Sequence, residues 1–154
     1  MNRKLYVAYG SNLHKKQMEY RCKDAIEVGT GKVNDYKLLF KGSKTGVYAT
    51  IEKKEGNFVP VLVWDISEED EKALDRYEGF PTFYYKKDIQ VIMDSGEVVE
   101  AMVYIMDKKR KVGKPSKEYY NIIKESYERL GFDIEILKNK QINKLLKYNK
   151  LFGF

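Results

Sequence analysis

The sequence of 154 residues has almost no cysteine or histidine, with Cys22 and His14 as the single examples. One cysteine allows no disulfide within the chain, and nothing in the cysteine count indicates secretion. One cysteine and one histidine also cannot form a thiolate zinc cluster, and the sequence contains no HExxH. We therefore expect no metal site, and the closeness of Ser11 and His14 in the sequence gives no support to a Ser-His-Asp triad.

Long hydrophobic runs are also absent from the sequence. The apolar run near the N-terminus is broken at 10–12 by glycine, serine and asparagine. That is well short of a signal-peptide core or a membrane span. We therefore expect a cytoplasmic protein that makes no membrane contact.

Nucleotide-binding motifs are missing as well, since neither GxxxxGK[ST] nor GxGxxG occurs, and we expect no cofactor. The formal net charge of +6 would suit a nucleic-acid partner. Most of the excess lysine lies in 107–114 and 137–150, which we interpret as a loop and a solvated helix face. RNP-type aromatic signatures and helix-turn-helix spacing are absent, so no nucleic acid is expected.

The composition that remains, 43% hydrophobic and 14% aromatic, is that of a folded protein, and the length fits one domain, 1–154. Alternating apolar residues predict strands. The expected strands are 4–9, 26–33, 36–40, 47–53 and 58–66, with a turn at 55–57, and a hairpin within 82–106 around a turn at 94–96.

Helices are expected where capping residues meet apolar residues spaced three or four apart. The expected helices are 13–21 after an Asn12 cap, a second from the capping box of Ser67 and Asp70 to Gly79, a third from Ser116 to Gly131, and a last one at 133–148. Strands that pair with their sequence neighbours, interrupted by one short helix, predict an α+β domain. Its core would be a mixed, mostly antiparallel β-barrel or sheet with flanking helices.

The first candidate site is VAYGSNL, residues 7–13, where a strand stops at three small residues and a helix follows. Backbone N–H groups at such a turn can bind a carboxylate or an oxyanion, and glycine allows a ligand close to the backbone. An ordinary helix cap is the alternative interpretation.

The second candidate site is LDRYEGFPTFYY, residues 74–85, where Glu78 ends a helix among aromatic residues. A helix C-terminus and an apolar setting both disfavour a carboxylate, so both would raise its pKa towards values useful for acid–base chemistry. An exposed glutamate at a helix end is the alternative.

Taken together, the chain resembles the gamma-glutamylcyclotransferase-like family. The resemblance rests on YVAYGSNL at 6–13, LDRYEGFPTFYYKK at 74–87 and the weaker PSKEYY at 115–120. It implies a β-barrel fold and release of 5-oxoproline from gamma-glutamyl amino acids, gamma-glutamyl amines or related conjugates, without metal or cofactor.

The resemblance also implies roles for individual residues. Glu78 would be the catalytic acid–base group, and Tyr119 would contact the substrate from the late helix. The substrate-binding loop would comprise Tyr6, Val7, Ala8, Tyr9, Gly10, Ser11 and Asn12. Tyr84 and Tyr85 both fit the position of an aromatic hydroxyl that lines the site.

Two other functions remain as alternatives. One is an enzyme of the same fold that acts on a different gamma-glutamyl or acyl conjugate in a biosynthetic pathway, and the other is a non-catalytic basic binding module. The aromatic residues at 148–154 would pack either on the barrel of the same chain or against a second subunit in a homodimer.

Overall fold

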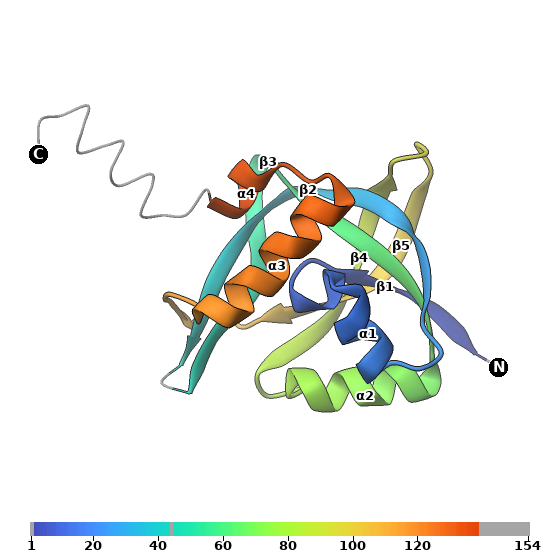
Figure 1. The fold of residues 1–154 in the computed structure, drawn as a ribbon, viewed down its shortest axis with the longest axis horizontal. Helices are drawn as coiled ribbons and strands as arrows, with labels where there is room; N and C mark the ends of the chain where they lie inside the picture. The colour runs from blue at the N-terminus through green and yellow to red at the C-terminus, as the bar shows by residue number, and fades with distance from the viewer. Residues whose placement is uncertain (1, 44, 139–154) are drawn as a thin grey trace, which may run out of the picture.

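Five strands of the chain close into a mixed β-barrel, with helices around it (Figure 1). The computed structural model describes residues 2–43 and 45–138. The barrel strands are β1 (Arg3–Ala8), β2 (Ile26–Ser43), β3 (Gly46–Ser67), β4 (Tyr84–Met93) and β5 (Val98–Met106). Their order is β3-β1-β5-β4-β2, and pairing of β2 with β3 completes the circle. Only β1 and β5 run parallel among these pairs of the described chain, so the expected mostly antiparallel barrel is confirmed.

Two long strands replace the four shorter strands expected between 26 and 66. The ladder of β2 with β3 continues past a register shift between Asn34 and Tyr36, so the turn predicted at 55–57 is wrong. At the shift Asp35 and Gly56 have positive φ values of 62° and 86°, and the Gly56 N–H donates to Asp35 Oδ1 at 3.0 Å. The glycine and aspartate signals therefore mark a bulge-like irregularity within the ladder of β2 and β3, and the chain does not reverse there.

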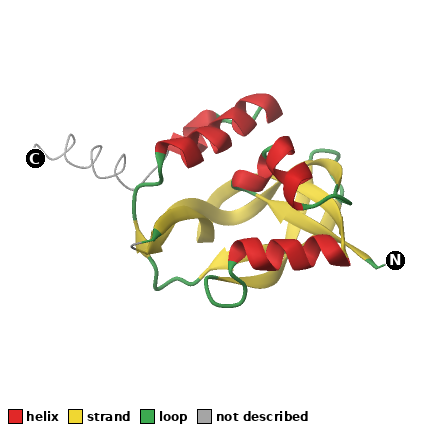
Figure 2. Cartoon of the chain, turned by 60° about the horizontal axis from the view of Figure 1, so that its bottom comes forward, coloured by secondary structure: helices red, strands yellow, loops and turns green. Residues whose placement is uncertain are grey.

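The helices lie outside the barrel (Figure 2). They are the 3-10 turn η1 (Ser11–Leu13), α1 (Lys15–Arg21), α2 (Glu68–Glu78), α3 (Lys117–Leu130) and α4 (Ile134–Lys138). The capping box at the start of α2 is confirmed, because Ser67 Oγ accepts from the Asp70 N–H while Asp70 Oδ2 accepts from the Ser67 N–H. Gly79, with φ 65°, ends the helix as expected and fixes Glu78 as its last residue.

The helix expected at 13–21 begins later than predicted, and Asn12 is not its N-cap. The chain first makes the turn η1, and His14 takes the N-cap position of α1 without a side-chain hydrogen bond. The Asn12 side chain is buried and donates to the Tyr6 hydroxyl at 2.9 Å. A tertiary hydrogen bond to β1 therefore replaces the local cap.

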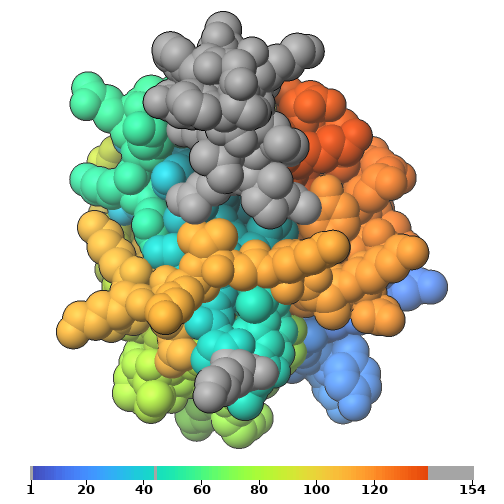
Figure 3. All heavy atoms as spheres, turned by 90° about the vertical axis from the view of Figure 1, so that its left-hand side faces the viewer, coloured from blue at the N-terminus to red at the C-terminus, as the bar shows by residue number. Residues whose placement is uncertain are grey.

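The basic segment after β5 was expected to be a loop, but Lys111–Val112 forms a short strand, β6, beside β2. Figure 3 shows this segment, in orange, crossing the face formed by β2 and β3. The last predicted helix, 133–148, is described only as α4, Ile134–Lys138. The remainder of that helix, much of the lysine-rich stretch and the aromatic residues at 148–154 lie outside the described residues. Within the described residues, no helix combines the length and the apolar character needed to cross a bilayer.

Candidate active site

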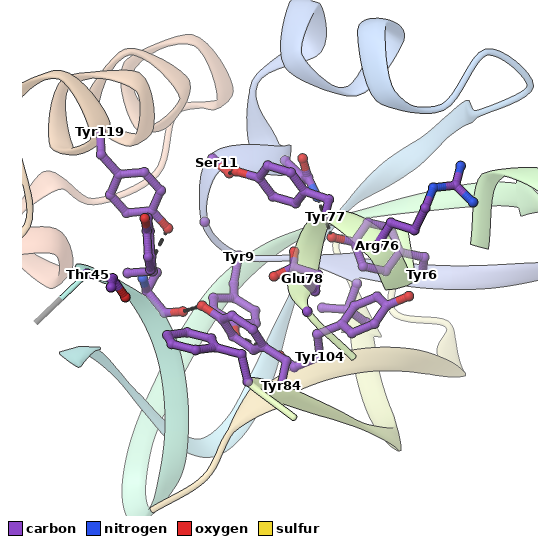
Figure 4. Close-up of a pocket in the computed structure, with 17 residues that line it drawn as sticks. Tyr6, Tyr9, Ser11, Thr45, Arg76, Tyr77, Glu78, Tyr84, Tyr104 and Tyr119 are labelled. Carbon is purple, nitrogen blue, oxygen red and sulfur yellow. Dashed lines mark hydrogen bonds between the residues drawn. The ribbon is translucent and has the colours of Figure 1, made fainter. Parts of the chain in front are cut away.

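A cavity of about 380 Å³ opens where the end of β1, the turn η1 and the end of α2 meet β3, β4 and α3 (Figure 4). Its volume lies in the range of small-molecule sites. The lining residues are Tyr6, Val7, Tyr9, Gly10, Ser11, Asn12, Thr45, Tyr48, Ala49, Arg76, Tyr77, Glu78, Gly79, Phe83, Tyr84, Tyr104 and Tyr119. Segments far apart in the sequence, including both candidate sites, therefore share one cavity.

Among the residues that the structure describes, Glu78 is the only acidic one that lines this cavity. Its carboxyl faces the space between the rings of Tyr9 and Tyr77 (Figure 4) and makes no hydrogen bond or ion pair with the described residues. Burial raises the pKa of Glu78 to about 7, and the Arg21 guanidinium opposes this rise in part. The carboxyl can therefore both accept and donate a proton near neutral pH.

The turn after β1 contributes Gly10, Ser11 and Asn12 to the cavity wall. Within the described residues, the N–H groups of Ser11 and Asn12 form no backbone hydrogen bond, whereas those of Leu13 and His14 donate to the Gly10 and Ser11 carbonyls. A Cβ at Gly10 would lie 3.2 Å from Ala49 Cβ and 3.4 Å from the Tyr119 hydroxyl. Only glycine fits without crowding this wall, as the candidate binding loop requires.

Two tyrosine hydroxyls are fixed on one residue of β3. The Tyr84 hydroxyl donates to the Ala49 carbonyl at 2.7 Å, and the Ala49 N–H donates to the Tyr119 hydroxyl at 3.0 Å. Tyr84 is buried and lines the cavity, while Tyr85 is 41% exposed and lies outside it. The geometry therefore favours Tyr84 over Tyr85 for the position that the sequence left open.

Of the other expected binding residues, Ala8 alone is missing from the described wall, because its side chain is buried in the core. Sequence reasoning did not assign a site role to several residues that do line the cavity: Thr45, Tyr48, Ala49, Arg76, Tyr77, Gly79, Phe83 and Tyr104. Tyr48 packs edge to face with both Phe83 and Tyr119, at centroid distances of 6.0 and 5.3 Å. Tyr77 and Phe83 lie within the second motif, whereas Tyr48 had no signal in the sequence.

We expect Tyr84→Phe to lower the free energy of unfolding by about 1 kcal/mol, because it removes the buried hydrogen bond to Ala49. The variant should also turn over more slowly, since Ala49 no longer holds the ring at the wall. Tyr85→Phe is the matched control and should change unfolding by less than about 0.5 kcal/mol. Urea unfolding and steady-state kinetics measure both; equal effects from the two variants would contradict the assignment of Tyr84.

Comparisons with known proteins place this sequence among related ones. The model of the family described as "Gamma-glutamyl cyclotransferase, AIG2-like" matches residues 6–129. The gamma-glutamylcyclotransferase of Bos taurus is 30% identical over 142 residues, covering 87% of this chain and 75% of the relative. The human gamma-glutamylcyclotransferase is 30% identical over 139 residues, covering 85% and 73%.

Solved structures show the same fold. A structure named gamma-glutamyl cyclotransferase matches with a TM-score of 0.81 and 27% identity, covering 89% of this chain and 85% of that chain. YkqA from Bacillus subtilis matches with a TM-score of 0.75 and 19% identity, covering 96% of this chain and 54% of that one. The second likeness shows the fold alone.

Proposed function

Because the chain belongs to the gamma-glutamyl cyclotransferase, AIG2-like family, we propose that this enzyme releases 5-oxoproline from a gamma-glutamyl amino acid or gamma-glutamyl amine. The proposal rests on the position and the pKa of Glu78. Among the described residues, it is the one acidic group that lines the cavity, and its pKa is raised to about 7. A group that titrates near the working pH is suited to accept and return a proton in one turnover.

The substrate brings its own nucleophile. Its α-amino nitrogen attacks the γ-carbonyl carbon, forming the C–N bond of a five-membered lactam, and the bond from that carbon to the leaving amine breaks. The Glu78 carboxylate takes a proton from the α-ammonium group and returns one to the leaving nitrogen. The second proton that the ring nitrogen loses on becoming a lactam N–H leaves with the product amine, which departs as its ammonium ion. Holding the substrate folded can supply several kcal/mol, up to about 7 to 11 in well-oriented intramolecular reactions.

The turn after β1 would stabilise negative charge in this reaction. The free N–H groups of Ser11 and Asn12 suit the glutamyl carboxylate or the oxyanion that develops on the γ-carbonyl. Fixed donors of this kind contribute about 3 to 4 kcal/mol to acyl-transfer transition states. The aromatic side chains of Tyr48 and Phe83, which also line the cavity, would contact the leaving group.

Gly10→Val should lower kcat/KM by about a hundredfold, because the new side chain crowds Ala49 and Tyr119 and displaces the loop donors. Gly10→Ala should fall between wild type and the valine variant, since it adds the Cβ alone. Kinetics of the three proteins, with melting temperatures as the folding control, measure this order. Normal kinetics in folded Gly10→Val would mean that the loop has only a structural role.

The test of the proposed function is 5-oxoproline release from gamma-glutamyl amino acids, gamma-glutamyl amines and the gamma-glutamyl-lysine isopeptide. We expect release from at least one of them, with one equivalent of free amine. Binding of glutamyl compounds without release would favour a different conjugate as substrate. Neither binding nor release would favour the basic binding module, whose affinity for a polyanion should fall steeply as salt rises.

A further inference from the structure

Arg21, at the end of α1, joins the binding loop to the helix that carries Glu78. Its Nη1 donates to Asn12 Oδ1 at 2.6 Å, and its Nη2 donates to Gln17 Oε1 at 2.7 Å. The guanidinium also lies on the Tyr77 ring, with Cζ 3.5 Å from the ring centroid. Tyr77 directly precedes Glu78, so one side chain contacts both halves of the candidate site.

These contacts continue into the cavity wall. Asn12 donates to the Tyr6 hydroxyl at 2.9 Å, and the hydroxyls of Ser11 and Tyr77 lie 3.2 Å apart. Asn12, Ser11, Tyr6 and Tyr77 all line the cavity, whereas Arg21 stands behind them. Displacing Arg21 would therefore loosen several wall residues at once.

Arg21 has an unusual charge environment for a partly buried guanidinium. Its hydrogen-bond partners are two neutral amides, and no carboxylate among residues 2–43 and 45–138 forms an ion pair with it. Buried charges are normally paired, because removing them from water is costly. The positive charge of Arg21 lowers the pKa of Glu78, although the two side chains form no ion pair.

Ionisable groups from several elements share the cavity wall with Glu78. They are Tyr6 from β1, Tyr9 after it, Tyr48 from β3, Arg76 and Tyr77 from α2, Tyr84 from β4, Tyr104 from β5 and Tyr119 from α3. Arg21 from α1 does not line the cavity, but its charge acts on Glu78. Burial raises the pKa of Tyr6, Tyr9, Tyr84, Tyr104 and Tyr119, so these hydroxyls are neutral near pH 7. Arg76 extends away from Glu78 (Figure 4), and among the described residues Arg21 is the cation whose charge lowers the pKa of Glu78.

We propose that Arg21 is a positioning residue, which holds the binding loop and the end of α2 in one arrangement and whose charge favours the ionised form of Glu78. This inference rests on the proposed acid–base role of Glu78. Arginine suits the task because its planar guanidinium can stack on a ring while it donates hydrogen bonds in its own plane, a geometry that the compact lysine ammonium does not have. The two effects can therefore be separated by substitution.

A titration of the Glu78 carboxyl by ¹³C NMR in the free protein tests the charge, and it does not depend on turnover. The Glu78→Gln variant identifies the resonance by its loss. Arg21→Gln should move the titration midpoint to higher pH, because removing a nearby cation disfavours the carboxylate. Arg21→Lys should keep the midpoint near that of wild type, and Lys16→Gln, which removes a charge from the exposed side of the same helix, should leave it unchanged.

Kinetics test the positioning. Arg21→Lys should lower kcat about tenfold to a hundredfold with an unchanged acid limb of kcat/KM against pH, because the charge remains but the loop and Tyr77 are less well held. Arg21→Gln should show the same loss together with an acid limb moved to higher pH, so part of its activity returns as the pH rises. Arg21→Lys also serves as the folded comparison if the glutamine variant fails to fold.

Two results would overturn the inference. One is an unchanged Glu78 midpoint in folded Arg21→Gln, and the other is an equal loss of activity in both variants at every pH, as a purely structural arginine would give. If the wild-type protein releases no 5-oxoproline, the proposed function fails. The titration still decides the effect of Arg21 on Glu78 in that case.

Discussion

Glu78→Gln is expected to lower kcat for 5-oxoproline release by about 10²-fold to 10⁴-fold, with a smaller change in KM. Glutamine has nearly the same shape but can neither take a proton from the α-ammonium group nor return one to the leaving amine. The cavity wall formed by the described residues offers no other carboxyl to replace it. Steady-state kinetics on the preferred substrate measure this loss.

Glu69→Gln is the matched control for this prediction. Glu69 lies on the exposed side of the same helix and forms an exposed ion pair with Lys72, so its replacement should leave kcat unchanged. Activity close to wild type in folded Glu78→Gln would remove Glu78 from the chemistry.

Glu78→Gln should also stabilise the protein above pH 7. Burial raises the folded-state pKa of Glu78 from 4.5 to about 7, so the folded protein holds this proton more tightly than the unfolded chain does. The free energy of unfolding therefore falls as the pH rises from about 4.5 to about 7. Above that range Glu78 is ionised in the folded protein, and the free energy of unfolding falls no further on its account. The shift corresponds to a cost of up to about 3 kcal/mol.

Urea unfolding at two pH values measures this cost. Glu78→Gln has no charge to desolvate, so at pH 8 it should be more stable than wild type by up to about 3 kcal/mol. At pH 4 the difference should be small, because Glu78 is mostly protonated in both states. A stability difference that does not change with pH would show that Glu78 is not a destabilised carboxyl.

Local signals in the sequence predicted much of the fold. The capping box of Ser67 and Asp70, the terminal glycines of α2 and α3 and the hairpin of β4 with β5 all depend on residues close together in the sequence. The long strands β2 and β3 were not foreseen, because Gly56 and its neighbours suit both a turn and a bulge. Only the pairing of β3 with β2 on both sides of the irregularity decides between the two.

The residues of the candidate site likewise fall into those predicted from local motifs and those set by packing between distant segments. Glu78 and the turn at Gly10 were predicted from their two motifs, and the structure brings both to one cavity. Tyr48 was missed because its place on the wall depends on packing against Tyr119, which lies 71 positions later in the sequence. Arg21 was missed because contacts with Asn12 and Tyr77 are set by how α1 meets α2.

The role expected for Asn12 shows how a local signal can mislead. Asparagine before a helix is a strong cap, yet here its amide donates to Tyr6 and accepts from Arg21. Both partners are fixed by the fold, and η1 moves the helix start beyond the reach of the side chain. Asn12 therefore belongs to a network of hydrogen bonds at the cavity wall and does not cap the helix.

The central claim is that the substrate's own α-amino nitrogen displaces the leaving amine. Turnover of the preferred gamma-glutamyl substrate in H₂¹⁸O tests it directly, with mass spectrometry of the products. We predict 5-oxoproline that carries no ¹⁸O, formed in equal amount with the free amine. Glutamate that carries ¹⁸O would instead show attack by water and would contradict the account.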